Sequence, residues 1–158
     1  MDSVVERIMQ HLETTLKGVT VGNGYANTIH TVQRVKADGQ ESVTGNGVHI
    51  IQGEDAIKGV WLNGEHDLLS RRLHVDLVIV AQSDVDVGGR TADSIMNSLE
   101  ADCRKAVQVD VSRGGLAVTT DEDQAGELDV QVGMPELRRV LGFAIRYRHR
   151  RTDPTIAG

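Results

Sequence analysis

Residues 73–80 read Leu-His-Val-Asp-Leu-Val-Ile-Val, and this stretch decides the fold. Every second residue from Leu73 to Ile79 is apolar, and alternate side chains of a β-strand lie on the same face of a sheet. The stretch therefore predicts a strand with one buried face. The opposite face becomes apolar toward its end, at Val78 and Val80, so we expect that end to be covered on both sides.

A second stretch with the same pattern lies near the C-terminus. Apolar residues alternate with small or charged residues from Leu141 to Tyr147, which predicts a long last strand. We expect Asp153-Pro154 to end regular structure, because proline cannot donate to a strand ladder, and residues 153–158 to form a mobile tail. Shorter strands are predicted at Ile29–Val35, Val48–Gln52, Leu116–Thr120 and Leu128–Val132.

Two segments have the period of an amphipathic helix. In the first, residues 4–17, Ser3 and Glu6 have the spacing of a capping box. In the second, residues 92–107, Thr91 is the expected N-cap. The expected apolar faces consist of Val5, Ile8, Leu12 and Leu16 in the first helix and of Ala92, Ile95, Leu99, Cys103 and Ala106 in the second.

The order of these elements predicts the fold class. Helices do not alternate regularly with strands, which argues against a doubly wound parallel sheet. We therefore predict an α+β fold, with an antiparallel or mixed β-sheet and two main helices packed on one face. A length of 158 residues suits a single domain, residues 1–152. Because aromatic residues make up only 3% of the chain, the core is expected to consist of Val, Leu and Ile, with Trp61 and Phe143 as the rare large side chains.

Composition excludes several classes of protein. The formal net charge of -6 argues against a general nucleic-acid-binding protein. Cys103 is the only cysteine, which excludes an intrachain disulfide and a thiolate metal cluster. Asp2 and Glu6 stand where a signal peptide would carry basic and then apolar residues, so none is expected. The longest strongly apolar run, around Leu77 to Ala81, is too short to cross a bilayer, so we expect no membrane contact.

The sequence contains no strong catalytic or metal-binding motif. The six histidines form neither HExxH nor HxH, and scattered surface histidines are favoured over a metal site near His66 and His74. Asp84 and Asp86 resemble the start of a calcium loop, but Ile95 stands where an EF-hand needs glutamate. Walker, GxGxxG and GxSxG motifs are absent. We therefore expect no enzyme activity, no metal and no cofactor.

The distribution of charge offers a candidate interface. Residues 146, 148 and 150 share one strand face by period two, and a row of guanidinium groups binds phosphates or carboxylates. Opposite charges on two faces suit head-to-tail contacts between copies, whereas ordinary solvated surface is the alternative. The acidic candidates are Asp121, Glu122 and Asp123, and the basic candidates are Arg146, Arg148, Arg150 and Arg151.

The order of motifs along the chain carries a family resemblance. A short N-terminal helix is followed by a Gly-Tyr segment at 24–29, and the strand at 73–79 is followed by a polar loop and the helix that contains Cys103. A strand with the residues Arg-Tyr-Arg-His at 146–149 and then Asp-Pro at 153–154 close the chain. Together these features resemble the tail terminator family of long-tailed bacteriophages, also called minor tail proteins.

The resemblance implies a structural protein of the virion tail, assembled in the host cytoplasm. A ring of six subunits would cap the finished tail tube, end tube polymerisation and present the head-joining surface. Its partners would be further copies of the chain, the tail tube protein and a head-completion or connector protein, with DNA only in transit through the lumen. A head-to-tail contact closes into a ring when its rotation allows. The expected contact places Asp121, Glu122 and Asp123 opposite Arg148, Arg150 and Arg151 of the next subunit.

Three alternatives remain open at this stage. A head–tail joining protein of the neck has similar size and is also oligomeric. A small-ligand or metal-dependent enzyme belongs to a different class, and ligand binding by the native fold would raise its thermal midpoint. A nucleic-acid-binding regulator would show steeply salt-dependent affinity for DNA.

Overall fold

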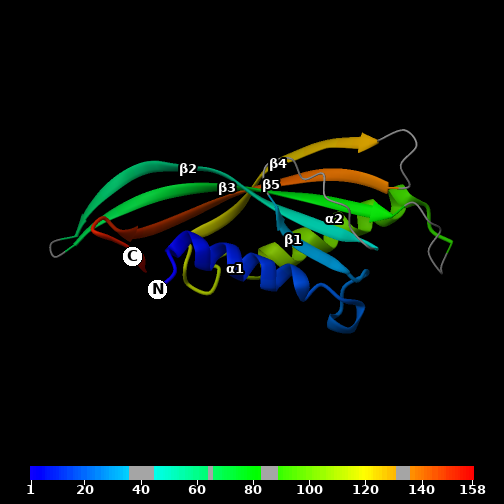
Figure 1. Cartoon of the computed structure of the whole chain (residues 1–158), viewed down its shortest axis with the longest axis horizontal. Coiled ribbons are helices and arrows are strands. Elements are labelled where there is room, and N and C mark those ends of the chain that lie inside the picture. Colours follow the sequence, from blue (N-terminus) through cyan, green and yellow to red (C-terminus); the bar gives the residue numbers. More distant parts are fainter. Residues whose placement is uncertain (36–44, 64–65, 83–88, 131–135) are drawn as a thin grey trace.

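A computed structural model of the chain describes residues 1–35, 45–63, 66–82, 89–130 and 136–158 (Figure 1). In chain order the elements are α1 (Val4–Lys17), the short 3-10 helix η1 (Val21–Asn23), β1 (Thr31–Val35), β2 (Gly47–Asn63), β3 (His66–Gln82), α2 (Ala92–Val109), β4 (Thr119–Val130), β5 (Glu136–Arg150) and β6 (Asp153–Ala157).

The strands form one mixed sheet. The strand order is β1-β2-β3-β5-β4, and β6 pairs with β5 beside this path. β1 and β2 are parallel, whereas the other strand pairs are antiparallel. The prediction of an α+β fold with a mixed sheet and two main helices is therefore confirmed.

The two helices follow their sequence patterns closely. α1 has the predicted bounds, and the Ser3 hydroxyl accepts a hydrogen bond from the Glu6 amide at 3.1 Å. α1 buries Ile8 and Leu12 as expected, whereas Val5 is only partly buried. α2 extends to Val109, two residues beyond the predicted end. Thr91 stands at its N-cap but makes no capping hydrogen bond through its side chain, so that detail of the prediction is wrong.

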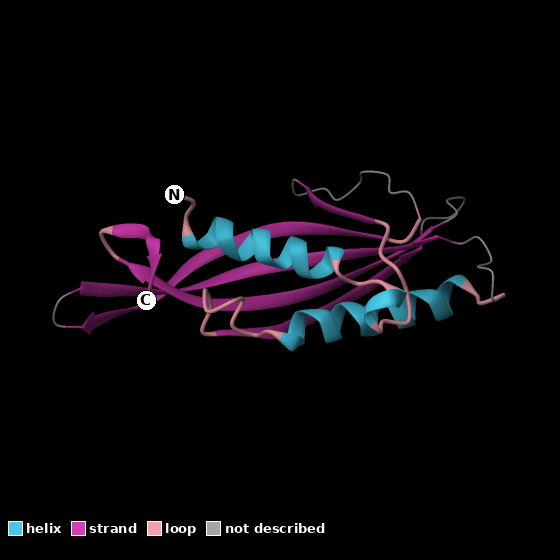
Figure 2. Cartoon of the chain, turned by 90° about the horizontal axis from the view of Figure 1, so that it is seen from below, coloured by secondary structure: helices cyan, strands magenta, loops and turns pink. Residues whose placement is uncertain are grey.

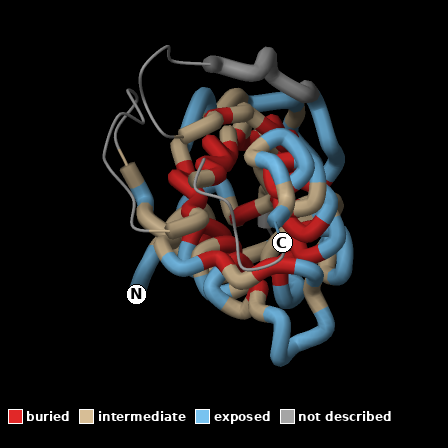
Figure 3. The backbone as a smooth tube through the Cα atoms, turned by 90° about the vertical axis from the view of Figure 1, so that its right-hand side faces the viewer, coloured by how far each residue is buried: buried red, intermediate tan, exposed pale blue. Residues whose placement is uncertain are grey.

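One buried cluster joins the helices to the sheet. α2 contacts β3 and β5, and α1 contacts β1, β2, β6 and α2. Alternate side chains of β3 from Leu73 to Ala81 are buried, as its period of two predicts. Val78 and Val80 are buried as well, which confirms that the end of this strand is covered on its second face. In Figure 3, where the backbone tube is coloured by burial, the buried segments lie toward the centre and exposed segments lie around them.

Two strands are much longer than their patterns indicate. β2 continues from the predicted end at Gln52 to Asn63, and β3 begins at His66, seven residues before Leu73. Register shifts between Gln52 and Asp55 and between Ile57 and Gly59 break the alternation of β2. β-Bulges of this kind disturb the period of two, which is why the pattern ended early.

The two long strands form a projection that we call the arm, residues 54–63 and 66–72. In Figures 1 and 2 the arm extends beyond the N-terminal end of α1. The last part of β5 supports it, because Ser70 pairs with Arg148 and Leu68 pairs with Arg150.

Regular structure does not end at Asp153-Pro154, and that prediction is wrong. β6 pairs with β5 through His149–Ala157 and Arg150–Asp153, with a register shift between the two pairs. Pro154 lies within that irregularity, where the ladder needs no amide from it. Arg7 of α1 also holds this segment, because its Nη2 donates to the carbonyl of Thr155 at 2.6 Å.

The structure differs from the sequence patterns in two further ways. β4 is one strand, Thr119–Val130, where two strands were predicted; the end of the second predicted strand lies outside the described residues. Trp61 is not part of the core, because it is 56% exposed, whereas Phe143 is 1% exposed as expected.

Candidate interaction surface

The acidic stretch predicted as an interface lies at the start of β4 and pairs with arginines of its own chain. The pairs are Asp123 with Arg72 of β3 at 2.7 Å, Glu122 with Arg104 of α2 at 3.0 Å and Asp121 with Arg146 of β5 at 3.3 Å. In the last pair the two side chains are 54% and 59% exposed. Exposed ion pairs contribute little to stability, so Asp121 and Arg146 can exchange partners at low cost.

These side chains surround a shallow groove of about 460 Å³. Its lining consists of Lys58, Arg72, Asp121, Glu122, Asp123, Ala144 and Arg146. Three basic and three acidic side chains line the groove, so it does not present the uniform positive field that phosphate recognition uses. The groove is therefore suited to exchange of ion pairs with another polar surface.

The remaining predicted arginines lie along the arm. The Arg148 guanidinium lies over the Trp61 ring, 4.4 Å from its centroid. Arg151 Nη1 lies 3.6 Å from Asp67 Oδ2. Within one chain the structure thus brings Arg146 to the acidic stretch and places Arg148 and Arg151 against the arm. Pairing between Asp121–Asp123 and Arg148, Arg150 and Arg151 of another subunit stays a prediction.

The arm exposes large apolar side chains that the sequence patterns did not single out. Ile57 is 58% exposed, Val60 50% and Leu62 81%. Paired residues of neighbouring strands lie on the same face, and Val60 pairs with Leu69, which pairs with His149. By the same rule Ile57 shares this face through Arg71 and Tyr147.

The face of the arm that carries these side chains continues the buried face of the sheet. Tyr147 and Ile145 of β5 belong to the core. The bulge at Lys58 is needed for this arrangement, because a strict period of two would place Ile57 and Val60 on opposite faces. Exposed apolar side chains that gather in one place mark contact sites with other molecules, unlike single scattered ones.

A polar cluster fixes the arm where it leaves the core. Arg71 Nε donates to both carboxylate oxygens of Asp55 at 3.1 Å, and the Tyr147 hydroxyl donates to Asp55 Oδ2 at 2.8 Å. Burial raises the pKa of Tyr147 well above its usual range, and the hydrogen bond to Asp55 adds to this effect. The neutral hydroxyl therefore stays a donor, and the cluster joins β2, β3 and β5 at the bulged part of the arm.

A cavity of about 270 Å³ adjoins this cluster and lies between the part of the arm next to the core, the start of α1 and β6. Asp55, Arg71, Tyr147, His149 and Pro154 are among its lining residues. The Asp55 carboxylate accepts hydrogen bonds from Arg71 and Tyr147, which fix its position beside the cavity.

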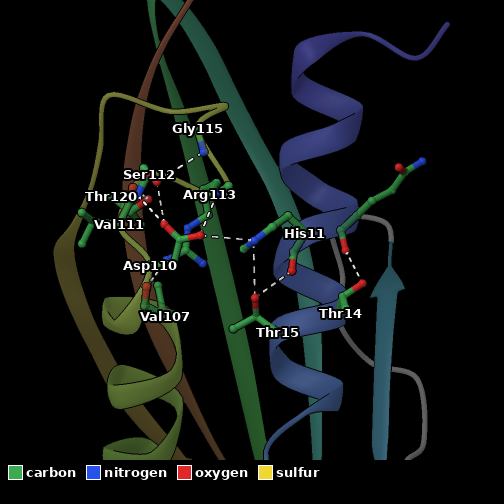
Figure 4. A network of polar contacts seen from close by, with 12 residues as sticks. His11, Thr14, Thr15, Val107, Asp110, Val111, Ser112, Arg113, Gly115 and Thr120 are labelled. Carbon is green, nitrogen blue, oxygen red and sulfur yellow. Dashed lines mark hydrogen bonds and ion pairs between the residues drawn. The ribbon is translucent and has the colours of Figure 1, made fainter.

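A tight turn connects α2 to β4, and its polar contacts are shown in Figure 4. The Asp110 carboxylate accepts hydrogen bonds from the Ser112 amide at 3.0 Å, the Ser112 hydroxyl at 2.7 Å and the Gly114 amide at 2.7 Å. These bonds, with the Ser112 hydroxyl contributing most, lower the pKa of Asp110. His11 Nε2 lies 3.4 Å from Asp110 Oδ2, which ties the turn to α1.

Arg113 in the same turn is fully buried, and its φ of 52° is left-handed. Its Nη2 donates to the carbonyl of Val107 at the end of α2. Its Nε and Nη1 are buried and have no hydrogen-bond partner among the residues that the structure describes. Burial lowers the pKa of the guanidinium, because the charged form loses its hydration.

Two further side chains that could do chemistry, Cys103 and His74, lie among the described residues. The Cys103 thiol is buried, and burial raises its pKa to about 12, so it is not a thiolate at neutral pH. His74 contacts Asp76 at 3.0 Å and Asp123 at 3.5 Å. Across the described ranges no three His, Cys, Asp or Glu residues are grouped to hold a metal ion.

Comparisons with known proteins give no family for the chain. No protein-family model matches the sequence, and no curated protein matches it. The resemblance to phage tail terminators therefore depends on the order of motifs alone. Among the described helices, none has the length and apolar character needed to span a membrane.

Proposed function

We propose that this chain is a structural subunit of a phage tail, a tail terminator that acts without catalysis. In this proposal copies of the chain form a ring on the finished tail tube, end its polymerisation and present the surface that binds the head. The observation that carries it is the arm, which projects beyond α1 and exposes Ile57, Val60, Trp61 and Leu62. Exposed apolar side chains gathered on a projection suit contact with another subunit.

The proposal includes the packing of both helices on one face of the sheet, as the order of elements along the chain predicts. Side chains of α1, such as Leu12, and of α2, such as Leu99, belong to one buried cluster with Leu77 of β3. Figure 2 supports this packing, because it views the molecule from below Figure 1 and both helices lie on the viewer's side of the strands. This arrangement would leave the opposite face, with Arg146 and Arg148, for partners.

Tail length tests the proposed function. Phage assemblies produced with and without the protein are compared by negative-stain electron microscopy. We expect overlong tails without heads when the protein is missing, because nothing then ends tube polymerisation. Tails of normal length without heads would contradict tail termination and favour a head–tail joining protein. Normal complete particles would contradict both structural functions.

A further inference from the structure

The cavity beside the arm contains a buried hydrogen-bond acceptor that the fold leaves unused. His149 lines this cavity and is 7% exposed. Its Nδ1 lies 2.8 Å from the Arg150 carbonyl oxygen, which can only accept, so Nδ1 carries the proton. The neutral ring then has its lone pair at Nε2, the ring nitrogen farther from the backbone. Nε2 makes no hydrogen bond with any residue that the structure describes.

The same cavity contains an unused donor. Arg71 Nε donates to the Asp55 carboxylate, and its Nη2 donates to the Asp55 carbonyl at 2.9 Å. Nη1 makes no hydrogen bond within the described part of the chain. The Arg71 and Asp55 side chains are 22% and 23% exposed, so this side of the cavity is open to solvent and to solutes.

The donor and the acceptor lie close enough to share one ligand group. Arg71 pairs with Tyr147, and His149 follows Tyr147 by two residues on the same face of β5. Arg71 and His149 are therefore diagonal neighbours, with about 7–8 Å between their positions in the two strands. A single planar group can span this separation when it accepts from Arg71 and donates to His149.

The charge of the cavity favours a neutral ligand. Asp55 and Arg71 form an ion pair, so their charges largely cancel. An ammonium group would lie against the Arg71 guanidinium. A carboxylate would lie against Asp55 and has no hydrogen to donate to His149 Nε2. A primary carboxamide is neutral and has a donor beside an acceptor, which matches both unused groups.

Apolar side chains continue from the cavity along the arm. Ile57 lies in the same row as Arg71 and Tyr147, and Val60 lies in the same row as His149. Both are at least half exposed on the face that the cavity shares, so they offer an apolar surface to the body of a ligand. The volume of about 270 Å³ is below the range of about 300–1,000 Å³ for pockets that hold drug-sized ligands, which limits the ligand to a smaller molecule.

We propose that this cavity binds a small neutral molecule with a carboxamide head and an apolar body. The carboxamide donates to His149 Nε2 and accepts from Arg71 Nη1, and the apolar body lies toward Ile57 and Val60. This binding site does not depend on tail termination, and no covalent step takes place in it.

Nitrogen NMR of the histidine rings tests the site directly. Benzamide is added to the full-length protein labelled with ¹⁵N-histidine, at pH 8, where ordinary imidazoles are neutral. We expect a Kd of about 1–10 mM, which is usual for so small a ligand. The Nε2 resonance of His149 should move upfield to a plateau, because a donor then binds its lone pair.

Acetophenone is the matched control compound. It keeps the ring and the carbonyl of benzamide but has a methyl group in place of the amide nitrogen, so it cannot donate. Loss of one hydrogen bond should weaken binding by about fivefold or more, and the Nε2 resonance should not move. Equal binding of the two compounds would overturn the proposal. Absence of any shift with benzamide would overturn it too, because the cavity would then hold only water.

Two substitutions separate the two ring nitrogens. His149→Asn keeps a donor near the position of Nδ1 and removes Nε2, so benzamide binding should weaken by about fivefold or more. His149→Gln places an amide oxygen near the position of Nε2 and should restore most of the affinity. Natural affinity in a folded His149→Asn variant would overturn the proposal. If that variant does not fold, the comparison of benzamide with acetophenone on the natural chain decides.

Protein concentration distinguishes a free ligand from a side chain of another copy. An Nε2 shift that grows with protein concentration, before any compound is added, would show that a second copy fills the cavity and would overturn the small-molecule site. Tail length is measured separately. Benzamide binding with normal complete particles would keep this site and reject tail termination, and overlong tails without benzamide binding would do the reverse.

Discussion

The ladder of β2 and β3 has two halves, the arm and the part beside the helices, and their apolar side chains have opposite surroundings. From Leu73 to Ala81 alternate apolar side chains of β3 are buried in the cluster that includes both helices. In the arm, apolar side chains of β2 are half exposed or more, including Val60 and Leu62. The difference shows that apolar residues of one strand pair serve folding in one half and remain available for contacts in the other.

The largest expected effect is the difference in stability between two matched substitutions, one in each half. Leu77→Ala removes a side chain that is 0% exposed, and we expect the free energy of unfolding to fall by about 2–5 kcal/mol. Leu62→Ala, at 81% exposure, should change it by less than about 0.5 kcal/mol. Urea unfolding of the dilute protein measures both. A loss of similar size at the two positions would show that the arm belongs to the folding core.

The junction between the halves should give the next effect. Tyr147→Phe removes the hydroxyl that donates to Asp55 while its ring still fills the core. A hydrogen bond to a charged group contributes about 1.5–3 kcal/mol, so we expect a loss in that range by urea unfolding. Hydrogen exchange should increase more at amides of the arm than at those of residues 73–81. A uniform increase would contradict a role in fixing the arm.

A substitution at the start of α1 tests the half that packs against the helices. Ser3→Ala removes the hydroxyl that accepts from the Glu6 amide, and we expect a loss of about 1 kcal/mol. Ser3→Asp is the control, because its carboxylate replaces the acceptor. The thermal midpoint measures both variants. Equal losses would indicate that this hydrogen bond does not stabilise the helix.

The smallest expected effect depends on pH. The Arg34 guanidinium donates to Glu6 at 2.6 Å and lowers the pKa of that carboxyl in the folded state. The pair therefore stabilises the fold above the unfolded pKa of glutamate, and this contribution disappears as the pH falls through the lower folded pKa. Because both side chains are about one third exposed, we expect no more than about 0.5 kcal/mol.

The matched variant for this last effect is Glu6→Gln, measured by urea unfolding at pH 7 and below the folded pKa. The difference in stability from the natural chain should be present at neutral pH and vanish in acid. A difference that persists in acid would contradict the ion pair as its source.

Sequence patterns predicted the parts of the fold that depend on local periodicity. The bounds of α1, the Ser3 cap and the buried face of β3 follow from side-chain spacing and from backbone amides at a helix start. The fold class follows from the order of elements. The candidate charges at 121–123 were predicted to face arginines of another subunit, which stays a prediction, and within their own chain they pair with Arg72, Arg104 and Arg146.

Sequence patterns failed where a distant partner overrides local spacing. The bulge at Lys58 moves Ile57 and Val60 to one face, and no period in the sequence shows this. Trp61 has the large apolar side chain expected of a core residue, but it lies on the arm against the Arg148 guanidinium rather than in the core. β6 forms despite Pro154, because β5 and Arg7 supply its partners.

The sequence by itself determined the two helices and the buried half of β3, because hydrogen-bond geometry and side-chain period act within a few residues. It also determined that Cys103 is a small core residue, because the spacing of apolar residues places it on the apolar face of α2. Only the tertiary structure decided which apolar residues become core and which stay exposed. Burial requires a second element on the same face, and pairing between strands distant in the chain places the arm beyond α1.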